Sequence, residues 1–352
     1  MKRRLVSMVM AGAMILSLAG CGGSGSGTTT TAATTAAQTE ATTAAETTKA
    51  EETTTAAEKA EATDGKTYQI GVLQLVQHSA LDRANEGFIK ALDDSGISYE
   101  ADQQNAAGEQ STCTTIAEQF VNDKKDLILA IATPAAQAAA AATTEIPIIL
   151  TAVTDPADSG LVESNEKPGG NVTGTSDLTP VKEQIELLTR VFPEAKKVGI
   201  LYCSAESNSV LQATMAQEAC DAVGLEHQDY TVSSSNEIQT VVESMVGNVD
   251  VIYAPTDNMV AAGMATVAMV ATENKLPVIC GEAGMVEAGG LATYGVDYYQ
   301  LGYVAGQQAV DILTGKATPA ETPIGYMPSD KCELKVNEDT AAALGLDPAT
   351  IK

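Results

Sequence analysis

The sequence predicts an α/β protein of two similar lobes, each a doubly wound parallel sheet, joined by a multi-crossing hinge. From about residue 67 onward, short apolar runs alternate with amphipathic or Ala-rich stretches, which is typical of βαβ units. The same order of segments then occurs twice along the chain. The folded part, 67–352, is large for a single core and of suitable size for two lobes.

The individual elements follow from the lengths of the apolar runs and from the turn residues beside them. Strands are predicted at 68–75, 126–132, 147–152, 197–203, 250–254, 277–280 and 290–294. Helices are predicted at 79–94, 109–122, 134–142, 180–191, 207–223, 236–246, 258–273 and 299–313. Right-handed crossovers between parallel strands would place these helices on both faces of each sheet.

A weak internal repeat supports the two lobes. "YQIGVLQLVQHSALDRA" corresponds to "KVGILYCSAESNSVLQA", "DLILAIATPAAQ" to "DVIYAPTDNMVA", and "IPIIL" to "LPVIC". One such correspondence means little, because parallel strands resemble one another. Three in the same order and at nearly equal intervals indicate two lobes of the same topology.

The N-terminus predicts export. Residues 1–20 combine three basic residues, an apolar stretch and small residues, as in a secretory signal peptide. The following "LAGC" resembles the bacterial lipobox, which implies diacylglyceryl transfer to Cys21 and cleavage before it. The alternative is an ordinary signal peptide with a chance cysteine. The expected location is extracytoplasmic, with a lipid anchor (a palmitate-type acyl group) on the outer face of the bacterial cell membrane.

Residues 21–66 are predicted to be the lipidated cysteine and a disordered tether. Between 22 and 66 the chain has no Val, Ile, Leu or aromatic residue and is mostly Thr, Ala and Glu. Such a segment cannot bury enough apolar surface to offset the entropy of ordering it.

Charge and cysteine spacing exclude several classes of function. A formal net charge of −26 argues against nucleic acid or anionic lipid as a partner. The five cysteines after Cys21 lack any CxxC pair, and the two histidines are far apart, so no metal site and no cofactor are expected. No GxSxG nucleophile elbow, HExxH or Walker A sequence occurs, so we expect no enzyme activity.

Ligands of open α/β sheets bind beyond the carboxyl ends of the strands. If two such lobes face each other, polar residues just after each strand become binding candidates. By position alone these are Gln74, Gln77, His78, Ser79, Thr133, Thr154, Asp155, Ser204, Glu206, Ser207, Asn208, Asp257, Asn258 and Glu282.

At these positions the sequence resembles the substrate-binding proteins of bacterial ABC importers with the type I periplasmic-binding-protein (Venus-flytrap) fold, of the tryptophan/tyrosine type. The resemblance rests on segments such as "ATPAAQA", "VTDPADSGLV", "NVTGTSDLTPVKEQIELL", "YAPTDNMV" and "YGVDYYQLGYVAGQQAVDIL", in order through nearly the whole folded part. It implies a protein that captures a small solute, with an aromatic or hydrophobic L-amino acid as the best candidate. It also implies a permease and an ATPase encoded elsewhere. The alternatives are a receptor lipoprotein that signals through a separate partner, or an importer of a sugar or nucleoside.

The resemblance also implies a site in which the two charged ends of an amino acid are bound by opposite lobes. The start of a helix at "TPAA", with Thr133, Ala135 and Ala136, would bind the carboxylate through free N–H groups, although an ordinary Thr N-cap is the alternative. Asp257 is the leading ammonium partner, ahead of Asp155 and Glu282, and a plain helix cap is its alternative. The remaining expected ligand-binding residues are Leu75, His78, Ser204, Ser207, Asn208 and Asn258, while Glu206 is interpreted as a solvated surface residue.

The hinge is expected at 175–180, 295–299 and 323–328, with Asp177 and Asp297 at crossings. The N-terminal lobe would then comprise 67–178 and about 298–325, and the C-terminal lobe 179–297 and about 326–352. The expected working motion is closure of the hinge around the ligand, in a protein that is a monomer.

Overall fold

The fold was examined in a computed structural model of the protein, which describes residues 65–351. The predicted signal peptide, Cys21 and the tether lie outside the described residues, apart from the last two residues of the tether.

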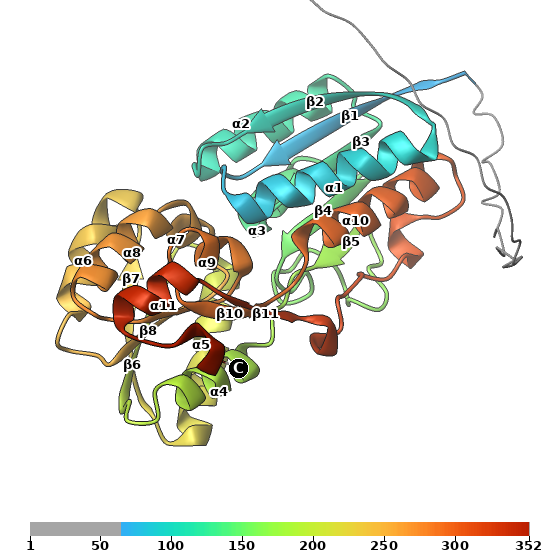
Figure 1. The fold of residues 1–352 in the computed structure, drawn as a ribbon. Coiled ribbons are helices and arrows are strands. Elements are labelled where there is room, and N and C mark those ends of the chain that lie inside the picture. The colour runs from blue at the N-terminus through green and yellow to red at the C-terminus, as the bar shows by residue number, and fades with distance from the viewer. Residues whose placement is uncertain (1–64, 352) are drawn as a thin grey trace, which may run out of the picture. The chain divides into compact units, whose positions relative to one another are not determined.

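The first sheet contains five parallel strands in the order β2-β1-β3-β4-β5. The strands are β1 (Thr67–Gln74), β2 (Ser98–Asn105), β3 (Leu127–Ile131), β4 (Ile148–Val153) and β5 (Val172–Ser176). Helices α1 (Ser79–Ser95) and α10 (Tyr298–Leu313) pack side by side on one face (Figure 1). Helices α2 (Gln110–Asn122) and α3 (Thr133–Ala142) pack together on the other. We call this sheet with its four helices the first lobe.

The second sheet contains six strands in the order β11-β10-β9-β8-β6-β7. The strands are β6 (Lys197–Cys203), β7 (Glu226–Val232), β8 (Val251–Ala254), β9 (Val278–Cys280), β10 (Ala292–Gly295) and β11 (Glu333–Val336). All run parallel except β11, which pairs antiparallel with β10.

Two hydrophobic clusters cover the two faces of the second sheet. One includes residues of α6 (Ile238–Met245), α7 (Asn258–Ala262) and α8 (Met264–Glu273), and the other includes residues of α4 (Val181–Val191), α5 (Ser207–Val223) and α11 (Glu338–Leu344). The short α9 (Ala283–Glu287) follows β9. This sheet with these seven helices is the second lobe, and the predicted class of two doubly wound α/β lobes is confirmed.

The chain passes between the two sheets at three places. It leaves β5 at Ser176 and enters α4 at Val181, and it leaves β10 at Gly295 and enters α10 at Tyr298. It then returns to the first sheet, where Gly325 bridges Thr175, before joining the second sheet at β11.

The α1–α10 contact holds the returning helix against the first sheet. A Cβ at Gly302 would overlap the backbone of Ala84, and one at Gly87 would overlap the backbone of Tyr299. Glycine at these positions lets the two helix backbones approach closely. The segment that follows the second crossing is thereby fixed to the first lobe.

Sequence reasoning missed the edge strands. The strands β2 (SYEADQQN) and β7 (EHQDYTV) carry many polar residues because each pairs on one side only and is largely solvent-facing. The short β5 and β11 were also missed. The predicted helix 258–273 is wrong as a single helix, because the structure divides it into α7 and α8 at Gly263.

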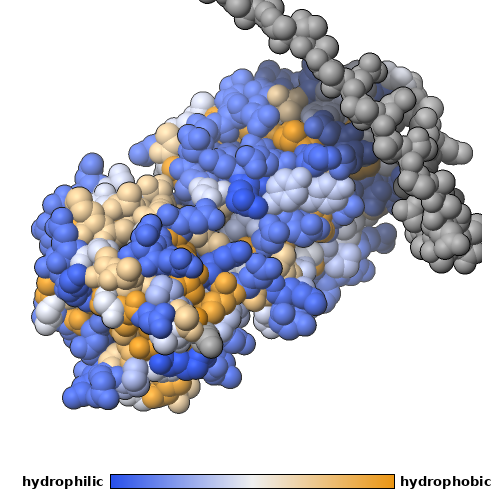
Figure 2. Space-filling view, viewed as in Figure 1, coloured by the Kyte–Doolittle hydropathy of each residue, from blue (hydrophilic) through white to orange (hydrophobic). Residues whose placement is uncertain are grey.

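The two lobes differ in the hydropathy of the surface seen in Figure 2. Figure 2 shows hydrophilic residues over most of the first lobe on this face, and more hydrophobic residues over the second lobe. The exposed large hydrophobic residues of the described chain are Val210, Val223, Met269 and Tyr326. None of the helices within residues 65–351 has both the length and the apolar character needed to span a membrane.

Candidate functional site

A small cavity lies between the two lobes, lined by residues that follow strands in both sheets. We call it the interlobe cavity. Its volume is about 10 Å³, room for about one water molecule, because side chains from both lobes fill the space. The lining residues are His78, Leu81, Ala152, Thr154, Asp177, Asn208, Thr256, Asp257, Asn258, Ala261, Glu282 and Tyr298.

A chain of hydrogen bonds from Glu206 to His78 joins the lobes at this cavity. Asn258 donates from Nδ2 to Glu206 Oε2 at 2.5 Å, and its Oδ1 lies 3.3 Å from Nε2 of His78. Because Asn258 Oδ1 only accepts, Nε2 of His78 carries the proton. Burial lowers the pKa of His78, so the ring is neutral and Nδ1 is an acceptor. His78 therefore presents an acceptor, Nδ1, at this cavity.

Asp257 caps α7 and ties two strands together. Its Oδ1 accepts from the Val260 N–H at 2.7 Å, and its Oδ2 accepts from the Cys203 N–H at 2.5 Å. The side chain is 1% exposed. Both oxygens thus accept backbone hydrogen bonds within the second lobe. This arrangement fits the helix-cap alternative better than the role of ammonium partner.

Glu282 has a similar local role at α9. Its carboxylate accepts from the backbone N–H groups of Met285 and Gly284. Burial raises its pKa to about 7. The carboxyl end of β9 therefore places a second buried acid at the cavity.

Asp177 lies in the first crossing and is only partly satisfied. Its Oδ2 accepts from the Tyr298 hydroxyl at 2.7 Å, which joins the first crossing to the second. Its Oδ1 is buried and has no hydrogen-bond partner among the described residues. Burial raises its pKa to about 6, an effect that the hydrogen bond from Tyr298 opposes.

Three buried polar atoms of the cavity lining lack partners among the described residues, and all three are acceptors. They are Nδ1 of His78, Oδ1 of Asp177 and Oδ1 of Asn208. The Nδ2 of Asn208 already donates to Thr256 O at 3.3 Å and to Ser209 Oγ at 3.2 Å. Buried acceptors without donors are costly, so this set favours a ligand group that carries several donors.

The same place concentrates four acidic side chains without a fixed cation. Asp177, Asp257 and Glu282 line the cavity, and Glu206 lies directly behind Asn258. No Lys or Arg is among the lining residues. Burial raises the pKa of Glu206 and of Asp257, and the Asp257 charge raises that of Glu206 further. The cavity is therefore suited to a cation that the protein itself does not supply.

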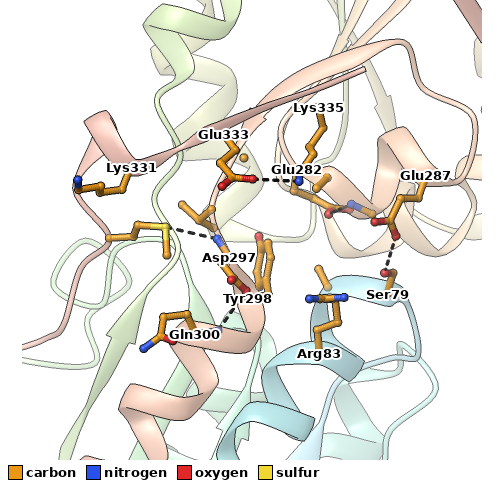
Figure 3. A pocket seen from close by; sticks show the side chains of 16 residues that line it. Ser79, Arg83, Glu282, Glu287, Asp297, Tyr298, Gln300, Lys331, Glu333 and Lys335 are labelled. Carbon is orange, nitrogen blue, oxygen red and sulfur yellow. Dashed lines mark hydrogen bonds and ion pairs between the residues drawn. The ribbon is translucent and has the colours of Figure 1, made fainter. Parts of the chain in front are cut away.

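A second, larger cavity of about 320 Å³ lies beside the hinge, and we call it the hinge cavity. Figure 3 shows Arg83 extending toward it from α1, with Glu287 and Ser79 hydrogen-bonded across one side at 3.1 Å. Glu282 and Tyr298 line both cavities. Its charged lining residues are largely exposed and of both signs, so the buried unpaired acceptors make the interlobe cavity the better ligand site.

The structure brings five of the predicted site residues together at the interlobe cavity. These are His78, Asn208, Asp257, Asn258 and Glu282. Ser207 forms a separate contact between the lobes, accepting from Gln137 Nε2 at 3.3 Å. Gln137 of "TPAAQ" therefore contacts the start of α5, and Asn258 of "TDNMV" contacts His78 just before α1. Each segment contacts the start of a helix in the other lobe rather than the other segment.

The other predicted residues lie elsewhere. Leu75 belongs to the first-lobe core, and Ser204 is exposed outside both cavities. Asp155 is engaged in its own loop, where Oδ1 accepts from Ala157 N, Asp158 N and Asn165 Nδ2. The interpretation of Glu206 as a solvated residue is wrong, because it is 7% exposed.

The "TPAA" segment differs in its details from the expectation. Helix α3 begins at Thr133, so the Ala136 N–H donates to Ala132 O at 3.0 Å and is not free. Thr133 makes no side-chain cap, and its buried hydroxyl has no partner among the described residues. The hydroxyl of Thr133 and the first-turn N–H of Ala135 are the available donors.

Asp177 and Tyr298 were placed near the expected hinge but not among the expected binding residues. Thr154, a candidate by position, and Thr256, which was not predicted, also line the cavity. Both follow strands, so position beside a strand end was the signal for them. Nothing in the local sequence shows that a hinge aspartate turns toward the cavity.

The raised carboxyl pKa values predict how stability varies with pH. The groups are the carboxyls of Asp177, Glu206, Asp257 and Glu282. In the unfolded chain such groups have pKa values of about 4. The folded protein therefore holds protons that the unfolded chain releases as pH rises from about 4 to 7. The free energy of unfolding should increase as pH falls from 8 to 5, by up to about 1.4 kcal/mol per pH unit for each such group. Urea denaturation across this range measures the slope.

Glu282→Gln isolates one of these groups. The variant should lose part of the slope between pH 7 and 5, because the glutamine amide does not titrate. Glu226→Gln, at an exposed residue, is the matched control and should keep the wild-type slope. Identical slopes for Glu282→Gln and the wild type would contradict the raised pKa of Glu282.

Comparisons with known proteins identify the family of this chain. The chain is 46% identical over 289 residues to a tyrosine-binding protein of Clostridioides difficile strain R20291, which covers 81% of this chain and 83% of that one. A solved ABC domain from Streptococcus pneumonia in complex with L-Trp is 38% identical, with a TM-score of 0.77. That match covers 80% of this chain and 96% of the other.

A third similar protein is an open, ligand-free substrate binding protein with adhesive properties from Clostridium difficile. It is 45% identical, covers 80% of this chain and 95% of its own, and has a TM-score of only 0.61. The arrangement described above thus resembles the L-Trp complex more than the open structure, despite the higher identity to the latter. The family model described as ABC transporter substrate binding protein matches residues 69–348, most of the chain. On this evidence the chain belongs to the ABC transporter substrate binding protein family.

Proposed function

We propose that this protein captures an aromatic or other hydrophobic L-amino acid between its two lobes and delivers it to an ABC permease and ATPase encoded elsewhere. The observation that carries the choice of an amino acid is the set of three unpaired buried acceptors in an acidic cavity without Lys or Arg. A primary ammonium group has three N–H donors and a positive charge, so it meets both requirements at once.

Asp177 is the proposed main partner of the ammonium group. Its Oδ1 has no other partner in the described part of the chain, whereas both oxygens of Asp257 are engaged in backbone hydrogen bonds. Nδ1 of His78 and Oδ1 of Asn208 would accept the two remaining N–H donors. A neutral sugar has hydroxyl donors but leaves the negative charge of the cavity uncompensated.

The start of α3 is the proposed partner of the ligand carboxylate. The Thr133 hydroxyl and the Ala135 N–H are donors, and the positive end of the dipole of this ten-residue helix lies there. The small side chains of Ala135 and Ala136 permit close approach. Because this segment lies outside the lining of the interlobe cavity, the proposal requires the lobes to shift as the ligand enters.

The choice of an aromatic side chain comes from the relatives. One relative is named for tyrosine binding, and a structural neighbour binds L-Trp, both well above 30% identity.

The ends of the three crossings support a hinge that divides the lobes as 67–178 with about 298–325, and 179–297 with about 326–352.

A lipid anchor on Cys21 is the proposed attachment to the outer face of the cell membrane. Members of this family act outside the cytoplasm, and "LAGC" followed by a Thr/Ala/Glu-rich segment is consistent with a tethered lipoprotein. No catalytic role is proposed for any residue.

L-Tyrosine, L-tryptophan and L-phenylalanine should each bind with 1:1 stoichiometry in isothermal titration calorimetry. Asp177→Asn should weaken binding about ten- to hundredfold, because a charge-assisted hydrogen bond is lost. Asp155→Asn is the matched control and should leave the affinity unchanged. Removing the amine from tyrosine, as in 3-(4-hydroxyphenyl)propionate, should weaken binding to the wild type more than to Asp177→Asn.

Two results would contradict this proposal. One is binding of a sugar or nucleoside with no response to any amino acid. The other is equal affinity of the wild type and Asp177→Asn for all three amino acids.

Cys21→Ser should release the protein from the membrane fraction into the medium when it is expressed in a Gram-positive host. The wild type should incorporate labelled palmitate, and the variant should not. Cys332→Ser, at the partly exposed cysteine of the described chain, is the control and should remain membrane-bound. A wild type that incorporates no palmitate, or a Cys21→Ser variant labelled as strongly as the wild type, would exclude the anchor.

A further inference from the structure

Gln212 of α5 makes a fully buried contact between the lobes. Its Nε2 donates to the Thr154 hydroxyl at 2.9 Å, and Thr154 follows β4 in the first lobe. Its Oε1 accepts from the Thr256 N–H at 3.3 Å in the second lobe. Gln212 is 0% exposed, and Thr154 is 2% exposed. One amide group is therefore shared between the carboxyl ends of β4 and β8.

The contact continues from Thr154 to the hinge. Thr154 and Asp177 line the same cavity, the Thr154 side chain lowers the pKa of Asp177, and Tyr298 donates to Asp177 Oδ2 at 2.7 Å. The Thr154 carbonyl also accepts from Ser176 Oγ at 2.6 Å. Gln212 in the second lobe is thus connected, through Thr154, to residues of the first and second crossings.

Gln212 differs from the other side chains that join the lobes. The contacts Gln137–Ser207 and Ser79–Glu287 are exposed, so water replaces them at little cost when they break. His78 and Asn258 line the interlobe cavity, where the proposed ligand binds. Gln212 is buried and does not line that cavity, so its energetic effect would act on closure rather than on ligand contact.

We propose that Gln212 is a positioning residue. It stabilises the closed arrangement of the lobes through its hydrogen bond to Thr154, whose carbonyl accepts from Ser176 at the start of the first crossing. This rests on the proposed function, because closure is taken to be the step that traps the ligand. The apparent dissociation constant of a ligand equals its intrinsic value divided by the fraction of closed, competent protein. Gln212 therefore sets the affinity for every ligand by one common factor.

The test compares Gln212→Met, which keeps the volume but removes the amide, with the wild type. Dissociation constants of L-tyrosine and L-tryptophan should both rise, by about tenfold and by the same factor, mainly through faster dissociation. Gln217→Met is the matched control, since Gln217 lies on the same helix and bonds Asp229 within its own lobe. It should leave both constants unchanged.

Two substitutions of Thr154, Thr154→Val and Thr154→Ser, test the Gln212–Thr154 hydrogen bond from its acceptor in the first lobe. Thr154→Val should reproduce the loss, and Thr154→Ser, which keeps the hydroxyl, should restore most of the affinity. In the double variant, Gln212→Met should add little to the loss of affinity caused by Thr154→Val, because of the hydrogen bonds of Gln212 only the one to Thr154 joins the lobes.

Hydrogen exchange of the ligand-free full-length protein gives a readout that does not depend on the ligand. Exchange over the peptide 78–84, in which His78 and Ser79 contact the second lobe but not Gln212, should be faster in Gln212→Met. If the wild type binds no amino acid, the proposed function fails while this experiment still tests the role of Gln212 in closure. Unchanged exchange there, or a loss of affinity for one amino acid only, would overturn the proposal.

Discussion

The cluster of buried carboxyl groups between the lobes, with no cation in the cavity lining, is the constraint on which the rest of the site depends. Asp177, Asp257 and Glu282 line one small cavity, with Glu206 behind it, and no Lys or Arg shares that lining. Ionised carboxylates are costly in such surroundings unless they are paired. Backbone N–H groups satisfy Asp257 and Glu282 locally, at the starts of α7 and α9. Asp177 keeps one oxygen without a hydrogen-bond partner in the described part of the chain, at a crossing between the lobes.

This division of roles explains why the helix-cap and ligand-binding alternatives for "YAPTDNMV" are not exclusive. Asp257 caps the helix and thereby fixes Asn258, which binds Glu206 and reaches His78 in the other lobe. The capping residue orients the neighbour that makes the contact between the lobes. A ligand ammonium group would find acceptors held in place by such local bonds rather than by long flexible side chains.

The sequence was sufficient to predict the two α/β lobes, because buried parallel strands read as apolar runs and repeat in order. It was insufficient for β2 and β7, whose edge positions leave them largely polar. It identified residues beside strand ends, including His78, Asn208 and Asn258, since fold topology places those ends together. It misjudged the burial of Glu206 and left Asp177 out of the expected binding residues, because burial and hydrogen bonding depend on contacts between distant segments. The exposed Ser204 and the loop-bound Asp155 show that position after a strand is not enough.

The central claim is that the ligand brings the missing cation to these carboxylates, and proton linkage tests it directly. An ammonium group bound beside Asp177 and Glu282 should lower their pKa values, which are about 6 and about 7 in the protein alone. Titration of L-tyrosine by calorimetry at pH 6.5, in buffers of different ionisation enthalpy, counts the protons exchanged on binding. The account predicts a net release of protons that declines toward zero by pH 8.5. Proton uptake, or no exchange at pH 6.5, would contradict it.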